Sequence, residues 1–340
     1  MLPERRKKLI VICISILFLV VVVLGIFFIT KKIKGNQETL FVSDAYPSDV
    51  VYFGLQHDEK KDQDILIGLN SSFEKTEYTL STFYKILDTK VIDQKLLVYS
   101  DAVNEVAYKE DDGKFLFNEV DTFYSNKVDV RLAGAYIVFM SDDGTLGFRK
   151  YQQSEKEKNY IIAEGLDKAN FIVINNTVFY RDIEGIIGFN MNSLDKQVVV
   201  SSSTTFYPYI EDVNDRYILL RSDKRYALYD WVDGEVTYIN ERFGVENIRI
   251  FSLFDKGFLY EREFPYAITA YNAFFKREEG SPYILASGYK VHEMYYISGT
   301  SCYLDAVDEN GEHKYYIYDV SSNAIVQTLE EAYQKIIKVR

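Results

Sequence analysis

The chain has 340 residues, of which 39 are lysine or arginine and 51 are aspartate or glutamate, giving a formal net charge of −12 at pH 7. This acidic balance disfavours a nucleic-acid partner, because affinity for phosphates depends on basic surface. Only two cysteines are present, so the composition excludes a fold held together by several disulfides.

At the N-terminus, a basic tail over 1–8 precedes a stretch over 9–30 that carries no charge. A helix rises roughly 1.5 Å per residue, so this stretch would extend about 33 Å, enough to cross a hydrocarbon core of about 30 Å. It also exceeds the apolar run of roughly 7–15 residues that is typical of a cleaved signal peptide. The sequence therefore predicts a single transmembrane signal anchor in contact with the lipid bilayer.

The charges on either side of this predicted anchor indicate its orientation. Residues 1–34 hold seven basic residues and one acidic residue, which leaves 32 basic and 50 acidic residues in the rest of the chain. We expect a cytoplasmic N-terminus, a linker over 31–39 and one extracytoplasmic domain over 40–340. Cys302 is the only cysteine of that domain. A large ectodomain without an internal disulfide favours a bacterial cell surface, of Gram-positive type.

The stretch over 207–239 shows the unit from which the domain is predicted to be built. Four short segments rich in aliphatic and aromatic residues are separated by turn residues, and we expect strands over 207–213, 217–222, 226–231 and 235–239. Four antiparallel strands joined by tight turns are typical of one blade of a β-propeller.

The same unit recurs along the chain at a nearly constant interval. In six units an apolar or aromatic run ends at an acidic residue, and these residues are spaced by 40 to 42 positions. We interpret them as structural blade markers that hold turns by accepting hydrogen bonds from backbone amides; they are Asp101, Asp142, Asp182, Asp223, Glu263 and Asp305. Val51-Tyr52-Phe53 is placed at the end of the second strand of a further unit.

These repeats predict an all-β, seven-bladed β-propeller with four-stranded antiparallel blades, preceded by one N-terminal transmembrane helix. An open solenoid would show the same period but would need capping repeats at both ends. A strand from one end of the chain must complete the first blade. The two candidates are Leu40-Phe41-Val42 and Ile336-Ile337-Lys338-Val339.

The runs Leu97-Val98-Tyr99-Ser100-Asp101 and Val178-Phe179-Tyr180-Arg181-Asp182 resemble the YWTD repeats of lipoprotein-receptor-type propellers and of the bacterial propeller domains that look like them. The resemblance covers roughly 40–340 as architecture, but only these short motifs as sequence. It implies a propeller fold. The tryptophan of the family is missing at every marker, so the resemblance implies nothing about the choice of ligand.

Residues suited to catalysis or metal binding are scattered. His57, His292 and His313 lie far apart in the sequence, and none has a second ligand at a helical metal-binding spacing, which argues against a zinc site. The carboxylates of Asp111-Asp112-Gly113, Asp142-Asp143-Gly144 and Asp233-Gly234 are interpreted as hairpin turns, with calcium binding as the alternative. The sequence shows no nucleophile elbow or phosphate-binding loop. We therefore predict a non-enzymatic protein without a cofactor.

Aromatic residues are abundant, with 29 tyrosines and 23 phenylalanines. Most are expected to pack between blades, as at Tyr226, Tyr229 and Tyr238. Tyrosines near strand ends are the candidate partner-facing residues, because tyrosine provides amphipathic contact area at low entropic cost. These residues are Tyr207, Tyr209 and Tyr289.

Together these features favour a protein-interaction module or subunit of a cell-envelope assembly, with another envelope protein as its partner. One alternative is a surface propeller that binds or hydrolyses glycans, with Asp182 and Asp223 as acid and base. Another is a ligand-sensing ectodomain that acts through a partner subunit.

Overall fold

The computed structural model describes residues 43–82, 84–121, 127–151, 159–166, 170–214, 216–239, 248–254, 257–262, 267–271, 283–287, 290–307, 310–319, 321–322 and 324–340. These residues belong to one compact unit, Ser43–Arg340. Its described strands form seven antiparallel sheets of four strands each.

The first four sheets lie between Tyr52 and Ser201, apart from one strand that comes from the C-terminus. The first sheet has the order β28 (Lys335–Lys338), β1 (Tyr52–Asp58), β2 (Gln63–Leu69) and β3 (Lys75–Ser81). The second contains β4 (Asp88–Ile92), β5 (Lys95–Tyr99), β6 (Val103–Lys109) and β7 (Lys114–Asp121). The third contains β8 (Lys127–Ala133), β9 (Tyr136–Ser141), β10 (Leu146–Lys150) and β11 (Tyr160–Ala163). The fourth contains β12 (Phe171–Ile174), β13 (Thr177–Asp182), β14 (Gly185–Asn190) and β15 (Lys196–Ser201).

The remaining three sheets follow the chain in the same way. The fifth contains β16 (Tyr209–Val213), β17 (Tyr217–Ser222), β18 (Arg225–Asp230) and β19 (Glu235–Tyr238). The sixth contains β20 (Ile248–Phe254), β21 (Gly257–Arg262), β22 (Ala267–Tyr271) and β23 (Tyr283–Ser287). The seventh contains β24 (Lys290–Ser298), β25 (Ser301–Val307), β26 (His313–Asp319) and β27 (Ala324–Leu329).

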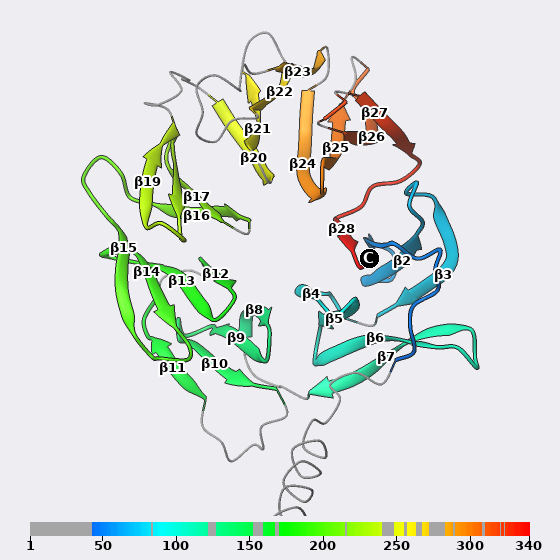
Figure 1. Cartoon of the computed structure of the whole chain (residues 1–340), viewed down its shortest axis with the longest axis horizontal. Coiled ribbons are helices and arrows are strands. Elements are labelled where there is room, and N and C mark those ends of the chain that lie inside the picture. The colour runs from blue at the N-terminus through cyan, green and yellow to red at the C-terminus, as the bar shows by residue number, and fades with distance from the viewer. Residues whose placement is uncertain are drawn as a thin grey trace, which may run out of the picture. The chain divides into compact units, whose positions relative to one another are not determined.

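The sheets are arranged around a common centre, with the first strand of each sheet innermost (Figure 1). Neighbouring innermost strands contact one another: β4 with β8, β8 with β12, β12 with β16, β16 with β20, β20 with β24, and β24 with β28. The arrangement is that of a β-propeller, so the predicted all-β propeller fold is confirmed.

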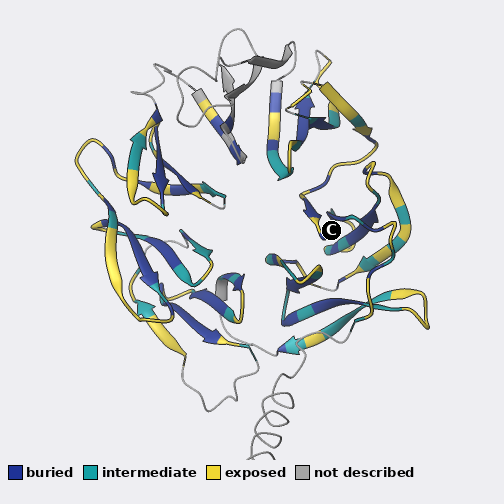
Figure 2. Cartoon of the chain, in the orientation of Figure 1, coloured by how far each residue is buried: buried dark blue, intermediate teal, exposed yellow. Residues whose placement is uncertain are grey.

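Burial follows the position of a strand within its sheet (Figure 2). In β5, the four residues from Leu96 to Tyr99 are all buried, because neighbouring sheets cover both faces of this strand. In the outer strand β3, exposed and partly buried residues alternate, because only one face packs inward. Fully burying one large aliphatic side chain contributes about 1.5–3 kcal/mol. The middle strands of the sheets therefore supply much of the stability.

Polar side chains on the innermost strands link neighbouring sheets. Asp88 Oδ2 accepts a hydrogen bond from the backbone N–H of Leu132 at 2.7 Å, and Asp212 Oδ2 accepts one from the N–H of Leu253 at 2.7 Å. Burial raises the pKa of Asp212, and the amide and hydroxyl donors around the carboxylate oppose this shift. Each bond spans just over 40 residues, so it joins one repeat to the next.

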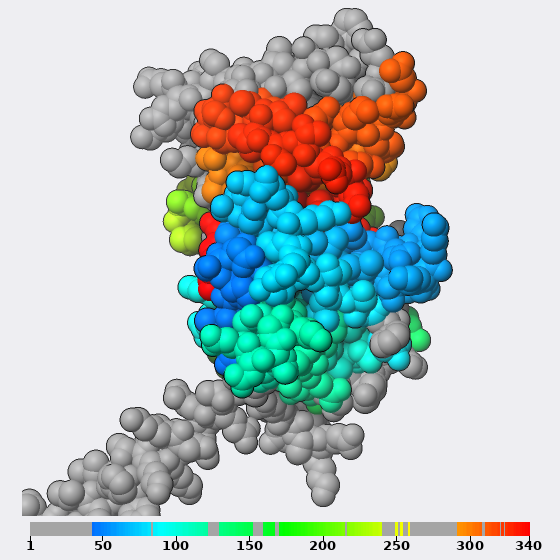
Figure 3. Space-filling view, turned by 90° about the vertical axis from the view of Figure 1, so that its right-hand side faces the viewer, coloured from blue at the N-terminus to red at the C-terminus, as the bar shows by residue number. Residues whose placement is uncertain are grey.

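The C-terminal strand closes the ring. In the pairing of β28 with β1, Ile337 lies opposite Phe53, and Lys335 Nζ donates to Thr89 Oγ1 of the second sheet at 2.9 Å. Arg340 Nη2 donates to the carbonyl of Tyr46 at 2.6 Å. Figure 3 shows the C-terminal strands, in orange and red, packed against the N-terminal sheet in blue. The closing strand is therefore the second of the two candidates; Leu40-Phe41-Val42 lies outside the described residues.

The structure corrects three predictions. The predicted transmembrane helix over 9–30 lies outside the described residues, and the part of the chain that is described has no helix long and apolar enough to span a membrane. The fold established here is thus the propeller alone. Val51-Tyr52-Phe53 lies at the start of the second strand of its sheet and not at its end, because β1 begins at Tyr52 and continues to Asp58. Asp305 lies inside β25 rather than at its end.

Candidate functional site

An arginine packs against two exposed tyrosines at the junction of the fourth and fifth sheets. The guanidinium carbon of Arg181, near the end of β13, lies 4.0 Å from the ring centroid of Tyr207 and 3.7 Å from that of Tyr209. The two rings are nearly perpendicular, at 88°, with centroids 6.2 Å apart. A cation placed over an aromatic face is stabilised by about 0.5–1 kcal/mol at an exposed site, and by about 2 kcal/mol when desolvated. We call these three residues the arginine–tyrosine cluster.

Asn170 holds both halves of the cluster in place. Its backbone carbonyl accepts a hydrogen bond from the N–H of Arg181 at 3.1 Å. Its side chain donates to the carbonyl of Ile210 at 3.0 Å and accepts from the N–H of Ile210 at 2.9 Å. Because Ile210 follows Tyr209 directly, the backbone and side chain of Asn170 together fix the tyrosine strand against the arginine strand. The cluster is thus built on rigid elements before any partner arrives.

The cluster borders an open cavity of about 480 Å³. Its lining comes from the segment 163–166, from Asn170, from Arg181, Asp182 and Ile183, and from Lys196 and Tyr207. Tyr207 and Tyr209 are 38% and 37% exposed, and Ile183 at the neighbouring turn is 83% exposed. Within the described structure, Arg181 Nε is buried without a hydrogen-bond partner. The site therefore combines aromatic, aliphatic and cationic surface around a hollow.

The carboxylate of Asp182 in the lining is engaged in the local turn. Its Oδ1 accepts a hydrogen bond from the backbone N–H of Glu184 at 2.7 Å, and its Oδ2 lies 3.9 Å from Lys196 Nζ. Asp223 lies in the turn between β17 and β18, with φ of 54°. Both acids named for the glycan alternative are therefore turn residues, and Asp182 bonds a backbone amide as expected of a blade marker.

The other markers differ in position. Asp142 directly follows β9, whereas Asp101 lies two residues beyond the end of β5. Asp101 Oδ1 accepts a hydrogen bond from the hydroxyl of Ser100 at 3.0 Å. Glu263 lies outside the described residues, as does the third candidate partner-facing tyrosine, Tyr289. Asp305 is 6% exposed and lies inside its strand, unlike the other markers that the structure describes.

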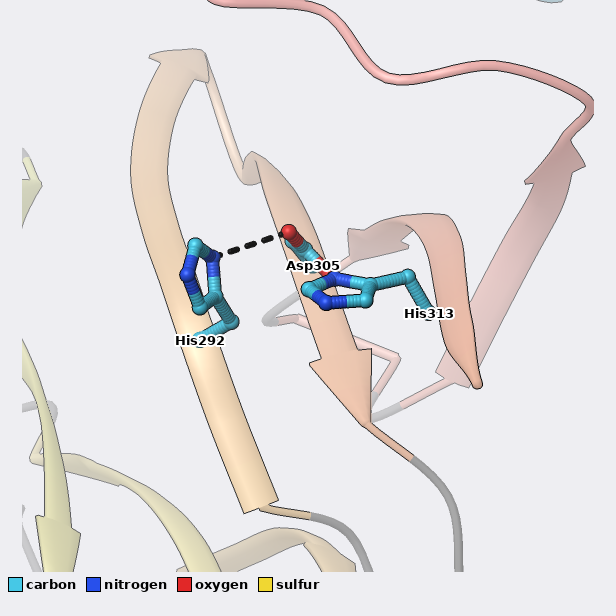
Figure 4. Close-up of side chains that lie close together, drawn as sticks. All are labelled: His292, Asp305 and His313. Carbon is cyan, nitrogen blue, oxygen red and sulfur yellow. Dashed lines mark hydrogen bonds and ion pairs between the residues drawn. The ribbon is translucent and has the colours of Figure 1, made fainter. Parts of the chain in front are cut away.

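Two histidines flank Asp305 on the seventh sheet (Figure 4). The Nδ1 atom of His292 lies 3.0 Å from Asp305 Oδ2, and that of His313 lies 2.7 Å from Asp305 Oδ1. The two imidazole rings are 5.0 Å apart between centroids, at 75°. Partial burial, and then the Asp305 charge, raise the pKa of the nearby Glu293 carboxyl. This grouping is the candidate metal-binding cluster among the described residues.

Strand pairing explains why sequence spacing missed this cluster. His292 and His313 are 21 positions apart and lie on β24 and β26, with Asp305 on the strand between them. A bulge in the pairing of β24 with β25 falls between Val291 and Glu293, at His292. Only the register of three strands brings these side chains together. Arg181 was overlooked for the same reason, because its tyrosine neighbours belong to the next sheet.

Cys302 occupies a structural position. It is fully buried and free, as the absence of a second cysteine in the domain predicted. Burial raises the pKa of its thiol. A thiol held in its neutral form by burial is a poor nucleophile, so Cys302 belongs to the core.

Comparison with known proteins finds solved structures to which this chain is similar. No protein-family model and no curated protein matches the chain, so the YWTD resemblance stays unconfirmed. BamB from Moraxella catarrhalis shares 12% identity over 86% of this chain and 84% of that chain, with a TM-score of 0.45. Apo AztD from Citrobacter koseri shares 10% identity over 84% and 88%, with a TM-score of 0.48. Dihydro-heme d1 dehydrogenase NirN, in complex with DHE, shares 10% identity over 86% and 65%, with a TM-score of 0.51. At such identities the likeness concerns the fold alone.

Proposed function

We propose that this propeller is a non-enzymatic protein-interaction module of a cell-envelope assembly, and that the arginine–tyrosine cluster is where it binds its partner. The observation that carries the proposal is the packing of Arg181 against two tyrosines that are more than a third exposed. Tyrosine and arginine are among the residues that most often dominate binding energy at protein interfaces.

The surroundings of the cluster favour a protein partner. Exposed Ile183 adds apolar contact area next to Tyr207, and the open cavity provides room for a side chain of the partner. Because Asn170 fixes the strands on both sides, little conformational entropy is lost when the surface is covered. The partner that fits is a protein segment with an apolar or aromatic anchor and a carboxylate near Arg181.

We place the domain outside the cytoplasm, following the charge pattern of the sequence. The chain after residue 34 carries 32 basic and 50 acidic residues, and its domain contains one cysteine. Both features suit an extracytoplasmic bacterial domain. The proposed partner is therefore another protein of the envelope.

The test is to isolate the tagged full-length chain from its native cells, lysed in mild detergent, and to measure the mass and stoichiometry of the complex. We expect a stoichiometric companion protein. The double variant Tyr207→Ser with Tyr209→Ser should reduce recovery of this companion at least about tenfold, because loss of each interface hot spot costs about 1–2 kcal/mol or more.

Tyr84→Ser is the matched control, because Tyr84 is 56% exposed and belongs to the segment between the first and second sheets. It should leave recovery of the companion unchanged. A wild-type chain that is isolated alone would overturn the interaction function. A companion that persists in the double variant, or that is lost equally in the control, would overturn the assignment of the binding surface.

A further inference from the structure

The seventh sheet carries a group of side chains that the interaction surface does not involve. His292 on β24, Asp305 on β25 and His313 on β26 come from three adjacent strands. His313 lies opposite Val307, two residues beyond Asp305, so His313 and Asp305 project from the same face of the sheet. The bulge at His292 brings the third side chain to that face.

The burial of the three residues is graded. The Asp305 side chain is only 8% exposed, whereas the side chains of His292 and His313 are 62% and 41% exposed. A buried carboxylate thus forms the floor of the group, and two imidazoles flank it with one side open to solvent. Figure 4 shows both rings directed at the carboxylate from opposite sides.

We propose that His292, Asp305 and His313 form a binding site for a divalent transition-metal ion of the zinc type. Each residue offers one donor atom, and these atoms all lie within 4.8 Å of one another. An ion with bonds of about 2.0–2.2 Å to nitrogen and oxygen requires donors gathered in such a volume. Two imidazoles and one carboxylate suit Zn²⁺, Co²⁺, Ni²⁺ or Fe²⁺, and a site with three protein ligands leaves a position for water or for another ligand.

A second histidine–aspartate pair in the same chain offers fewer metal ligands than this group does. His57 Nδ1 lies 2.8 Å from Asp64 Oδ1, but Asp64 Oδ2 accepts a hydrogen bond from the backbone N–H of Ile86. Asp64 therefore faces only one imidazole, and its second carboxylate oxygen is already bonded to a backbone amide. At Asp305, by contrast, each oxygen faces an imidazole. The Asp305 group therefore offers a second nitrogen ligand, which the His57–Asp64 pair lacks.

The experiment is to titrate the purified full chain, after treatment with a chelator, with Zn²⁺ and to measure binding by calorimetry. One ion per chain is expected, and excess Mg²⁺ should not displace it, because Mg²⁺ prefers oxygen ligands. His292→Ala and His313→Ala should each weaken binding at least about tenfold. Co²⁺ provides a second readout, since its visible absorption spectrum reports nitrogen ligation and should change in both variants.

The matched control is His57→Ala, which removes a histidine bonded to a buried aspartate at another sheet. It should bind Zn²⁺ as the wild type does. Thermal unfolding in the presence of chelator verifies that all variants fold. The proposal is overturned if the wild type does not bind Zn²⁺ at micromolar concentrations, or if the loss of His57 weakens binding as much as the loss of His292 or His313.

Discussion

The carboxylate of Asp64 holds the backbone N–H of Ile86 at 2.5 Å while its other oxygen lies 2.8 Å from His57 Nδ1. Asp64 is completely buried on β2, and its backbone carbonyl also accepts a hydrogen bond from the N–H of Thr82. Ile86 belongs to the connection that leads into β4 of the second sheet. One side chain therefore fixes how the chain passes from the first sheet to the second.

Replacing Asp64 by alanine should destabilise the domain. The variant leaves the N–H of the buried Ile86 without its acceptor, and an unsatisfied buried donor costs about 1–3 kcal/mol. We expect the free energy of unfolding, measured by urea titration, to fall by about that amount. Glu59→Ala is the control, because Glu59 is an exposed carboxylate in the hairpin that precedes Asp64. It should change the free energy by less than about 0.5 kcal/mol. Equal losses in the two variants would contradict the role given to Asp64.

Ring closure by β28 makes a second prediction. Ile337 is 8% exposed and packs in the cluster that joins the first and second sheets, whereas Ile325 on the outer strand β27 is 43% exposed. Ile337→Ala should lower the free energy of unfolding by about 2–5 kcal/mol, because it leaves a cavity in a packed core. Ile325→Ala, the same substitution on an outer strand, should cost less than about 1 kcal/mol. Thermal unfolding of both variants tests this difference. A similar stability for the two would show that the terminal strand does not close the ring.

The prediction from sequence succeeded where local pattern determines structure. The expected strand over 217–222 coincides with β17, because an apolar run bounded by turn residues is a local signal. Tyr226 and Tyr229 are buried as expected, but Tyr238 is 40% exposed. It belongs to the outer strand β19, which no further strand covers within the sheet, and the position of a strand in its sheet cannot be read from its own residues.

The candidate sites depended on information that a single sequence does not contain. Tyr207 and Tyr209 could be nominated from composition and position, but their contact with Arg181 depends on how two sheets pack. The grouping of His292 with His313 depends on strand register and on one bulge. Register and bulges follow from tertiary packing as much as from local propensity. Such contacts therefore appear only once the sheets are assembled.

Asp319 makes the stability of the seventh sheet depend on pH. It ends β26 and accepts hydrogen bonds from the backbone N–H and the hydroxyl of Ser321, both at 2.9 Å, and from the hydroxyl of Ser322 at 2.9 Å. Burial acts to raise its pKa, but the hydrogen bonds from Thr300, Ser321 and Ser322 together outweigh burial and lower the pKa from 3.8 to about 2. The folded state therefore favours the ionised carboxylate.

Because the folded pKa is lower than the unfolded pKa, this stabilisation is fully present above about pH 4 and is lost as the pH falls towards 2. Asp319→Asn should lower the free energy of unfolding by about 1–2 kcal/mol at pH 7 and at pH 5, since it weakens hydrogen bonds to a charged acceptor. The difference from the wild type should shrink at pH 3, where the unfolded wild-type carboxyl is largely protonated. Ser322→Ala removes one donor and should show a smaller loss over the same pH range. Urea titrations at the three pH values measure these differences. A difference between Asp319→Asn and the wild type that stays constant from pH 7 to pH 3 would contradict the lowered pKa, because it would show that ionisation of Asp319 is not linked to folding.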